Sequence, residues 1–274
     1  MFIGIDIGGT HTRVASGTQG KIGQKIDFPT REFQTTIQDI KEAVETISNN
    51  NPVTRIGVGV PGPFDFRTGK TLHPPHLVGW DNIEIVNYFS NLLKTKVVVG
   101  HDASVAALGE YHYGAGRLKN PMLYYTVSTG IGVGLVVNGK MYKGIYNPEA
   151  GHQILGREGR LCLCKQEEDL ETYSSGQGLE ILTGQDPVEL EKTKIWEEAL
   201  EWLSIGLANS ILHYSPEIVV IGGGMTKHKN LFFPPLEKFL KRHLHQVPPV
   251  PIVPAALGQD AGIVGALTLA ELGD

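Results

Sequence analysis

The first residues of this chain that could do chemistry are a carboxylate and a pair of glycines. In "FIGIDIGGTHTRVASG" (2–17), Asp6 stands in an apolar run, two residues before Gly8-Gly9-Thr10. A carboxylate in such a run costs free energy unless something uses its charge, and Mg²⁺ prefers oxygen ligands. Glycines permit the positive φ of a tight turn and let backbone N–H groups approach a ligand closely. The segment therefore favours a phosphate-binding turn beside a magnesium ligand, with Asp6 as a structural cap as the alternative.

The turn fits neither of the two commonest phosphate-binding loops. The dinucleotide fingerprint needs a third glycine followed by a helix, and a Walker loop ends in Gly-Lys-Ser/Thr. Here a second strand is expected from Thr12, and no such lysine follows. The expected device is a strand–turn–strand unit.

The same layout occurs a second time in the chain. The segment "MLYYTVSTGIGVGLVVNGK" (122–140) again shows a strand, a glycine turn and a strand, with a later turn at Asn138-Gly139. Recurrence of a whole supersecondary unit suggests two domains of the same design, although chance similarity between two glycine-rich hairpins is the alternative. Two such domains facing each other would grip one polyphosphate from opposite sides.

The elements that position these turns follow from the periodicity of apolar residues. Short apolar or alternating runs predict strands at 2–7, 12–16, 21–28, 54–60, 96–99, 217–224 and 251–253. Helical spacing predicts helices over 33–50, 82–96, from Asp102, 190–213, about 231–245 and from about Asp260, with both aspartates as N-caps. The stretch 144–180 fits neither period. This order predicts an α/β protein with mixed sheets.

Composition sets limits on the class of protein. The 274 residues exceed the usual size of one domain, and 41% of them are apolar, enough for real cores. A net charge of −5 with mixed signs argues against a nucleic-acid partner. No apolar run approaches the ~20 residues that span a bilayer, and no signal segment is seen, so no membrane partner is expected. Cys162 and Cys164 are too close for an ordinary structural disulfide, so we expect a cytoplasmic protein with reduced thiols.

Motifs along nearly the whole chain resemble those of the ROK family (repressor, open reading frame, kinase), which are sugar kinases within the actin-like ATPase superfamily. The matching segments are "GIDIGGTHTRVA" and "STGIGVGLVVNGK" for the two phosphate segments, "GVGVPGPFD" and "LVGWDN" for sugar-side loops, "HDASVAALGE" for the catalytic aspartate, "EAGH" and "LCLC" for the family signature, "IVVIGGGM" for the adenosine segment and "LGQDAGIVGALTLA" for the closing helix. Any single match is modestly specific, and the correct order of all of them is highly specific.

The resemblance implies a fold and an activity. The fold is two actin-like (ribonuclease H-like) α/β domains, each with a mixed sheet, facing each other across a cleft. Residues 1–108 with the helix at about 258–274 would form the smaller domain, and 109–257 the larger one. The implied activity is phosphorylation of a hexose by ATP with Mg²⁺, with glucose converted to glucose 6-phosphate as the leading reaction. The family also implies a homodimer.

Asp102 is the residue to which the resemblance gives the role of general base. It follows the apolar strand "VVVG" and stands where a helix begins, which is a rigid place for a base. A simple N-cap is the structural alternative, and the two roles are compatible.

The resemblance also implies the residues that bind the ligands. Carboxylates and an imidazole recognise sugar hydroxyls through charge-assisted hydrogen bonds. The implied sugar pocket consists of Gly62, His101, Asp102, Glu149, His152 and Glu171. The implied nucleotide ligands are Asp6, Gly8, Gly9, Thr10, Thr129 and Gly130 at the phosphates and Gly223 and Gly224 at the adenosine. Each of these glycines could equally serve only the geometry of a turn.

Position 101 departs from the family pattern, which has asparagine before the base. His101 is bulkier than asparagine and carries a titratable ring. The change puts a glucose preference in doubt more than kinase activity, and it keeps kinases for N-acetylmannosamine, fructose or allose open. Ser128 and Val133 are milder departures near the second turn.

The family's structural zinc site is present with one substitution. His152, Cys162 and Cys164 match three ligands, and Asp169 stands where the family has a third cysteine. Zinc accepts a carboxylate, and an imidazole with two thiolates suits it. If zinc binds, it would fix His152 and orient the sugar pocket through the other ring nitrogen. The alternative is a decayed site whose loop is held by packing alone.

A sugar-sensing regulator without catalysis is the alternative from a different class. The family's repressors resemble this chain but carry a DNA-binding segment before the first strand. Because the first predicted strand begins at Phe2, and the charge balance is acidic, DNA binding is not expected.

Overall fold

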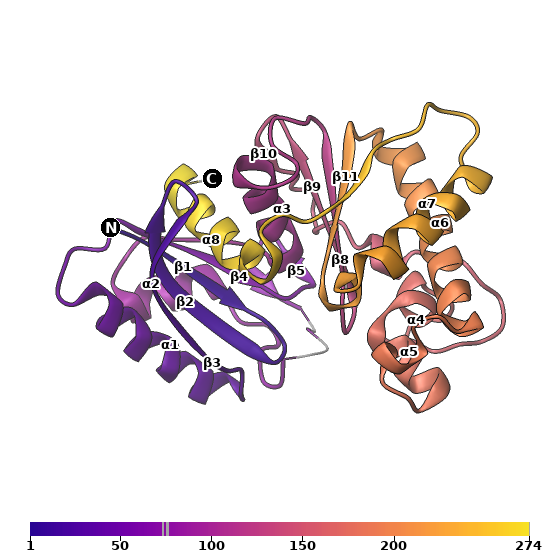
Figure 1. The fold of residues 1–274 in the computed structure, drawn as a ribbon. Coiled ribbons are helices and arrows are strands. Elements are labelled where there is room, and N and C mark those ends of the chain that lie inside the picture. The colour runs from indigo at the N-terminus through magenta and orange to yellow at the C-terminus, as the bar shows by residue number, and fades with distance from the viewer. Residues whose placement is uncertain (73, 75–76, 274) are drawn as a thin grey trace.

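Two five-stranded sheets of the same design form the frame of the molecule (Figure 1). The computed structural model describes residues 1–72, 74 and 77–273. Positions 73, 75, 76 and 274, which belong to the first domain expected from the sequence, lie outside the described residues.

The first sheet has the strand order β3-β2-β1-β4-β7. Its strands are β1 (Phe2–Ile7), β2 (His11–Thr18), β3 (Lys21–Pro29), β4 (Arg55–Val60) and β7 (Val97–His101). The first three strands form an antiparallel meander, and β4 and β7 continue the sheet in parallel with β1. A small hairpin, β5 (Phe64–Asp65) with β6 (Lys70–Thr71), follows β4. The sheet is therefore mixed, as predicted.

The second sheet repeats this plan with the order β10-β9-β8-β11-β12. Its strands are β8 (Met122–Val127), β9 (Ile131–Val137), β10 (Lys140–Met141), β11 (Ile218–Gly222) and β12 (Ile252–Pro254). Again the first three are antiparallel and the last two run parallel to the central strand. The internal repeat predicted from two glycine turns is confirmed.

The helices cover the outer faces of the sheets and fill the space between them. They are α1 (Phe33–Ser48), α2 (Ile85–Leu93), α3 (Asp102–Tyr113), α4 (Leu170–Ser174), α5 (Gly176–Thr183), α6 (Lys194–Tyr214), α7 (Lys229–His243) and α8 (Ala261–Leu272). The outer helix α1 is amphipathic, with Ile37, Ile40 and Val44 buried against the sheet. No helix among the described residues is long and apolar enough to span a bilayer.

Helices α3 and α8 pack against each other where the two sheets meet (Figure 1). Helix α8 also packs on β1 and β4, and α3 on β8 and β9, so both helices are buried on nearly every side. A helix buried all round needs apolar or small residues on every face. A Cβ on Gly265 would lie 1.8 Å from the carbonyl oxygen of Val105, so only glycine permits this approach. Small residues in α8 therefore serve the close packing of the two helices.

Several element boundaries differ from the sequence prediction. The helix predicted at 82–96 is shorter, because Lys94 ends α2 in the left-handed conformation (φ 51°). The helix predicted at 190–213 begins at Lys194, where the hydroxyl of Thr193 accepts from the Trp196 N–H at 3.3 Å. The stretch 144–180 contains α4 and the start of α5, which are too short to show a helical period.

Candidate active site

The turn between β1 and β2 leaves Gly9 and Thr10 exposed to solvent. The Gly8 N–H donates to the carbonyl of His11 at 2.9 Å, and the Thr30 hydroxyl donates to the carbonyl of Gly8 at 2.7 Å. The expectation of positive φ at these glycines is wrong, because none of them lies in the left-handed region. Gly8 serves a close approach instead, since a Cβ there would lie 3.0 Å from the carbonyl oxygen of His11. The backbone of the exposed turn is free to meet an anionic ligand.

Asp6 lies buried behind this turn. Its carboxylate pairs with Arg13 at 3.2 Å and packs against the first turn of α8, where a Cβ on Gly262 would lie 2.5 Å from Oδ2. Burial raises the pKa of Asp6 to about 6, although Arg13 opposes the shift and the charge of Asp102 adds to it. A buried carboxylate with a raised pKa would gain from a divalent cation nearby, and the role of Asp6 as a magnesium ligand stays a prediction.

The turn between β8 and β9 is braced from behind by α4 and α5. The Glu171 carboxylate accepts a hydrogen bond from the Ile131 N–H at 2.7 Å. The carbonyls of Ser128 and Thr129 accept from N–H groups in the first turn of α5, at 2.7 and 2.9 Å. A Cβ on Gly130 would lie 2.5 Å from Glu171 Oε2, so the close approach requires glycine although φ is not positive. Glu171 therefore supports the second phosphate turn as well as the predicted sugar pocket.

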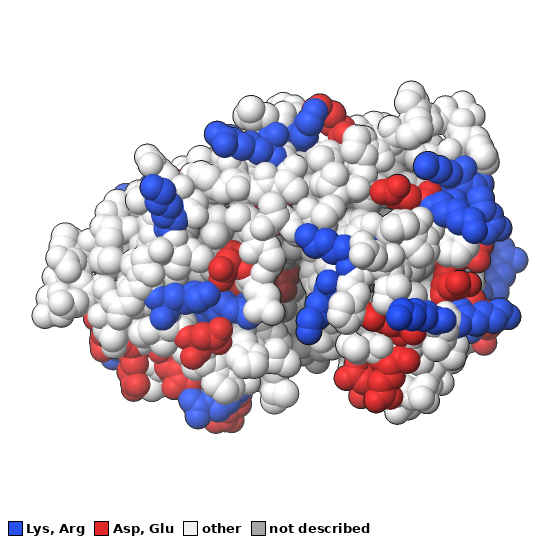
Figure 2. Space-filling model, in the orientation of Figure 1, with Lys and Arg blue, Asp and Glu red and all other residues white. Residues whose placement is uncertain are grey.

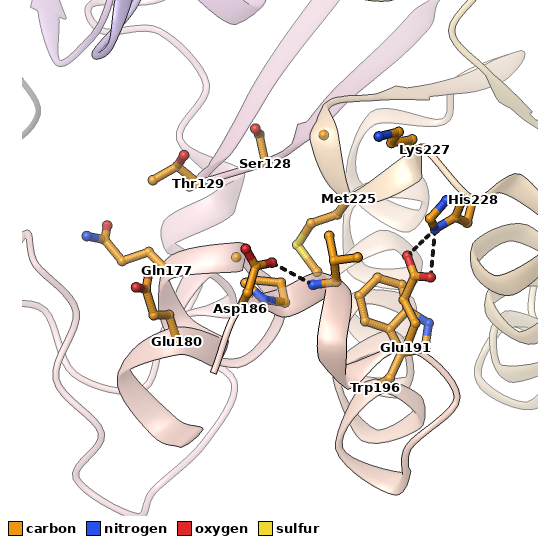
Figure 3. A pocket seen from close by; sticks show the side chains of 14 residues that line it. Ser128, Thr129, Gln177, Glu180, Asp186, Glu191, Trp196, Met225, Lys227 and His228 are labelled. Carbon is orange, nitrogen blue, oxygen red and sulfur yellow. Dashed lines mark hydrogen bonds and ion pairs between the residues drawn. The ribbon is translucent and has the colours of Figure 1, made fainter. Parts of the chain in front are cut away.

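A pocket of about 270 Å³ opens beside the second turn (Figure 3). Thr129 and Gly224 line it, together with an apolar wall from Trp196 and Met225. Gly223 has φ 97°, and a Cβ there would lie 2.3 Å from the carbonyl oxygen of Val127. One predicted phosphate residue, Thr129, and one predicted adenosine residue, Gly224, therefore line the same pocket, whereas Gly130 and Gly223 do not line it.

Sequence reasoning missed part of this pocket. His228 and Glu191 form an ion pair across it at 2.7 Å (Figure 3), and they come from segments 37 residues apart. Both lie near helix starts, where polar residues are common, so no pattern in the sequence singled them out.

Asp102 is the first residue of α3 rather than its N-cap. The N-cap position belongs to His101, and the Asp102 side chain accepts from its neighbour, the Ala103 N–H, at 2.6 Å. The predicted capping role is therefore wrong in detail, although the position at the helix start is correct. Asp260 also makes no cap with its side chain and pairs with Lys25 at 2.8 Å.

Residues predicted for the sugar pocket gather around Asp102. His101 Nε2 lies 3.1 Å from Asp102 Oδ1. A Cβ on Gly62 would lie 2.9 Å from both Glu149 Oε1 and His101 Cδ2, so the three residues are in close contact. The absence of a side chain at position 62 keeps space open between the carboxylate and the ring.

Asn147, which sequence reasoning missed, ties this group to both halves of the molecule. It is buried, donates to Glu149 Oε1 at 2.6 Å and accepts from the Phe64 N–H at 3.2 Å. The Phe66 N–H also donates to the carbonyl of Ile145 at 3.2 Å. The hairpin that follows β4 is therefore hydrogen-bonded to the loop that carries Glu149.

His152, Cys162, Cys164 and Asp169 form a compact cluster whose ligand atoms all lie within 4.8 Å of one another. His152 Nδ1 lies 3.9 Å and 3.6 Å from the two sulfurs, and Cys164 Sγ lies 3.7 Å from Asp169 Oδ2. Such separations suit ligands around a tetrahedral zinc with bonds of about 2.0–2.3 Å. The cluster therefore fits a zinc ion.

The two carboxylate oxygens of Asp169 have different partners in the cluster. Asp169 Oδ2 lies 2.7 Å from His152 Nδ1, while Oδ1 caps α4 by accepting from the Thr172 N–H at 3.0 Å. The hydrogen bond with Asp169 raises the pKa of His152, and the charges of Glu171 and Glu149 act in the same direction. His152 Nδ1 therefore faces the cluster, and Glu171 reaches the cluster as well, because Cys162 Sγ lies 3.5 Å from Glu171 Oε1.

Figure 2 shows a hollow in the surface between the two halves of the molecule. The repeated sheets with one glycine turn each define a protein of the actin-like (ribonuclease H-like) class, built from two mixed α/β domains. The chain belongs to the ROK family, whose model matches residues 2–272. The resemblance found in the motifs is confirmed.

Known proteins similar to this chain cover it almost completely. The solved ROK hexokinase from Thermus thermophilus has a TM-score of 0.88 and 30% identity, covering 99% of this chain and 98% of that chain. A ROK family glucokinase from Streptomyces griseus, solved in complex with glucose and AMPPNP, has a TM-score of 0.85 and 26% identity, covering 99% of both chains. A fructokinase from Pediococcus pentosaceus is 27% identical, over 99% of this chain and 98% of that protein.

Proposed function

We propose that this chain is an ATP-dependent hexose kinase that converts glucose to glucose 6-phosphate. The observation that carries the proposal is the place of Asp102, at the start of a buried helix and 3.1 Å from His101, one of the residues expected to bind the sugar. Full-length similarity to a ROK hexokinase and to a glucokinase solved with glucose and AMPPNP supports it.

In the proposed reaction Asp102 is the general base. It accepts the proton of the sugar hydroxyl as the bond from that oxygen to the γ-phosphorus forms. The bond from the γ-phosphorus to the β–γ bridging oxygen breaks, and ADP leaves. The side chain of Asp102 is about one-third exposed, so a substrate can reach it.

The two glycine turns hold the phosphates in this proposal. Backbone N–H groups of Gly9 and Thr10 from one half, and of Thr129 and Gly130 from the other, donate to phosphate oxygens, while Gly8, whose own N–H is bonded to the His11 carbonyl, keeps the turn tight. Asp6 lies behind the first turn and would hold hydrated Mg²⁺, which neutralises charge on the phosphates when bound. The nucleoside occupies the pocket beside Gly224, with Gly223 allowing the strand end to pass close by.

In this proposal the sugar is oriented by Glu149, His152 and Glu171. The charges of the two glutamates raise the pKa of His152, which supports the placement of the three residues near one another. Gly62 and His101 form the wall of that space next to Asp102. A fructokinase among the similar proteins keeps fructose as the second candidate substrate, and N-acetylmannosamine and allose stay open beside it.

Zinc is proposed at the cluster of His152, Cys162, Cys164 and Asp169, where it would hold His152 in place. Purified protein is expected to contain about one zinc per chain by elemental analysis. Asp169→Asn keeps an oxygen that can cap α4 but lacks the anionic ligand, and it should lower zinc occupancy; Asp169→Cys should keep it. Protein grown and purified with zinc that contains none would reject the site.

The domain division, the oligomeric state and the cellular location expected from the sequence are also part of the proposal. Residues 1–108 with the closing helix would form one domain, and 109–257 the other. The packing of α8 on β1 and β4 supports this division, whereas α3, which the boundary divides, packs on β8 and β9. A homodimer in the cytoplasm is the expected state, and the mass in solution tests the dimer.

The activity is tested by a coupled assay of ADP release with saturating Mg²⁺ and ATP. The panel consists of glucose, fructose, mannose, N-acetylmannosamine and allose. We expect turnover with glucose to be the fastest. Turnover on another hexose only would correct the substrate, and no turnover on any of them would reject the kinase proposal.

A further inference from the structure

His101 is the last residue of β7 and is nearly fully buried, with 4% of its surface exposed. Its Nε2 lies 3.1 Å from Asp102 Oδ1, although the two residues are adjacent in the chain. A buried histidine next to the proposed base raises the question of what its ring does there.

The contacts decide which ring nitrogen carries the proton. Nε2 lies 3.1 Å from Asp102 Oδ1, and a carboxylate oxygen only accepts, so a proton on Nε2 would have an acceptor beside it. The other nitrogen, Nδ1, is buried and has no hydrogen-bond partner among the described residues. A proton on Nδ1 would therefore be a buried donor without an acceptor, which is the more costly state. The neutral ring with its proton on Nε2 satisfies the geometry.

The surroundings of the two oxygens of Asp102 are unequal. Oδ1 accepts from the Ala103 N–H at 2.6 Å and lies 3.1 Å from His101 Nε2. Two donors at one oxygen would fix the rotation of the carboxylate. Oδ2, for which the described residues show no hydrogen-bond partner, is left for a ligand.

The ring is itself held in place. Its Cδ2 and Nε2 lie against the backbone of Gly62, where a Cβ would come within 2.9 and 3.1 Å of them, and where Glu149 Oε1 also lies. Because the wall on this side is backbone, the ring cannot turn away from Asp102 without displacing the turn at Gly62.

We propose that His101 is a positioning residue for the general base: its Nε2–H holds Asp102 Oδ1, so that Oδ2 faces the sugar hydroxyl. The inference rests on the proposed function, since it assigns a role within that same reaction. His101 transfers no proton to or from the substrate in this scheme.

Two variants separate this role from simple packing. His101→Asn keeps an N–H donor but leaves space, whereas His101→Leu fills the space but has no donor. Positioning predicts that His101→Leu lowers kcat about ten- to a hundredfold with less than about a threefold change in the hexose KM. His101→Asn should keep kcat within about fivefold of the natural protein. A packing role predicts the reverse order, and equal rates for both variants would also overturn the proposal.

A second measurement does not depend on activity. Long-range ¹H–¹⁵N spectra of histidine-labelled protein show which ring nitrogen carries the proton, and His101→Asn identifies the signal. We expect a neutral ring protonated at Nε2. A proton on Nδ1 overturns the inference even if the protein is an active kinase. If no hexose is phosphorylated, the hexose kinase proposal fails, and the spectrum alone decides on the contact between His101 and Asp102.

Discussion

The two halves of the molecule share one plan and differ at the positions where chemistry is expected. Each half has a five-stranded sheet of the same order, with a glycine turn after its central strand. Asp6 and Thr126 occupy equivalent places, because each pairs with a glycine of the next parallel strand one residue before the central strand ends. The first half thus places a buried carboxylate where the second has a hydroxyl.

The turns themselves differ in support. The first turn is held mainly by its own backbone and by Thr30, and it leaves its tip exposed. The second is braced by Glu171 and by the first turn of α5. The difference teaches that the duplicated fold supplies two similar glycine turns with unequal support. In the proposed function both turns bind phosphate, and the departures from the duplication give the cation to one half and the nucleoside to the other.

An aspartate stands at the start of each of the two central helices, α3 and α8, and the two aspartates have different surroundings. Asp102 begins α3 after the last strand of the first sheet, and Asp260 precedes α8 after the last strand of the second. Asp102 faces the predicted sugar pocket, whereas Asp260 forms a surface ion pair with Lys25. Equivalent positions in the repeat therefore carry different roles.

The largest effect is expected when Asp102 is replaced, and the same change at Asp260 serves as the comparison. Asp102→Asn removes the proton acceptor and should lower kcat by about 10³-fold, with sugar affinity nearly unchanged. Asp260→Asn is the matched control, with unchanged rate and a stability loss below about 1 kcal/mol, because exposed ion pairs contribute little. Steady-state kinetics, sugar titration and thermal unfolding measure these effects. An Asp102→Asn enzyme that keeps most of its rate would show that the base is another residue.

The next largest effect is expected from alanine substitutions in the two glycine turns. Gly130→Ala places a Cβ 2.5 Å from Glu171 Oε2, so the carboxylate must move and its bond to the Ile131 N–H is lost. We expect kcat to fall by about ten- to a hundredfold, as for a misplaced ligand group. Gly8→Ala meets only the His11 carbonyl, at 3.0 Å, and should cost less. A larger loss in Gly8→Ala, measured by the same kinetics, would contradict the proposed bracing.

Stability against pH tests the buried charge of the first half. The folded-state pKa of Asp6 is about 6, above its ordinary value of 3.8. Folding therefore favours the neutral form of Asp6. The contribution of this residue to the free energy of unfolding is fully present below pH ~4 and is lost as the pH rises through 6. Asp6→Asn stays neutral, so without Mg²⁺ it should match the natural protein near pH 4 and exceed its unfolding free energy by about 1–3 kcal/mol at pH 8.

Denaturant unfolding at the two pH values measures this difference. Arg13 keeps Asp27 as a partner at 3.2 Å in the variant, which limits other losses. The quantity that decides is the unfolding free energy of Asp6→Asn minus that of the natural protein. If this difference is smaller at pH 8 than at pH 4, ionised Asp6 does not destabilise the fold.

The smallest effect concerns the cluster loop, which has no counterpart in the first half. Lys165 is exposed and has φ 71°, where a side chain is strained. Lys165→Gly relieves that strain, partly offset by greater freedom of the unfolded chain, and should stabilise the protein by up to about 1 kcal/mol. Thermal unfolding of the zinc-loaded protein measures it, with exposed Lys238→Gly inside α7 as a destabilising control. A destabilised Lys165→Gly would contradict this account.

Much of the frame could be predicted from the sequence, because strand and helix periods reflect burial on one face. The turns at Gly8 and Ser128, the repeat and the metal-ligand spacing were all local patterns. The bracing by Glu171, the Asn147 contact and the His228–Glu191 pair were not, because each joins residues far apart in the chain. The capping role of Asp102 was wrong because the helix begins at that residue rather than after it.

The central claim is that one nucleotide lies across both turns with a sugar hydroxyl at Asp102. A crystal structure with glucose and a non-hydrolysable ATP analogue tests it most directly. We expect phosphate oxygens at the backbone N–H groups of Gly9 and Gly130, and the 6-hydroxyl within hydrogen-bond distance of Asp102 Oδ2. Phosphates bound at only one turn, or a sugar turned away from Asp102, would contradict it.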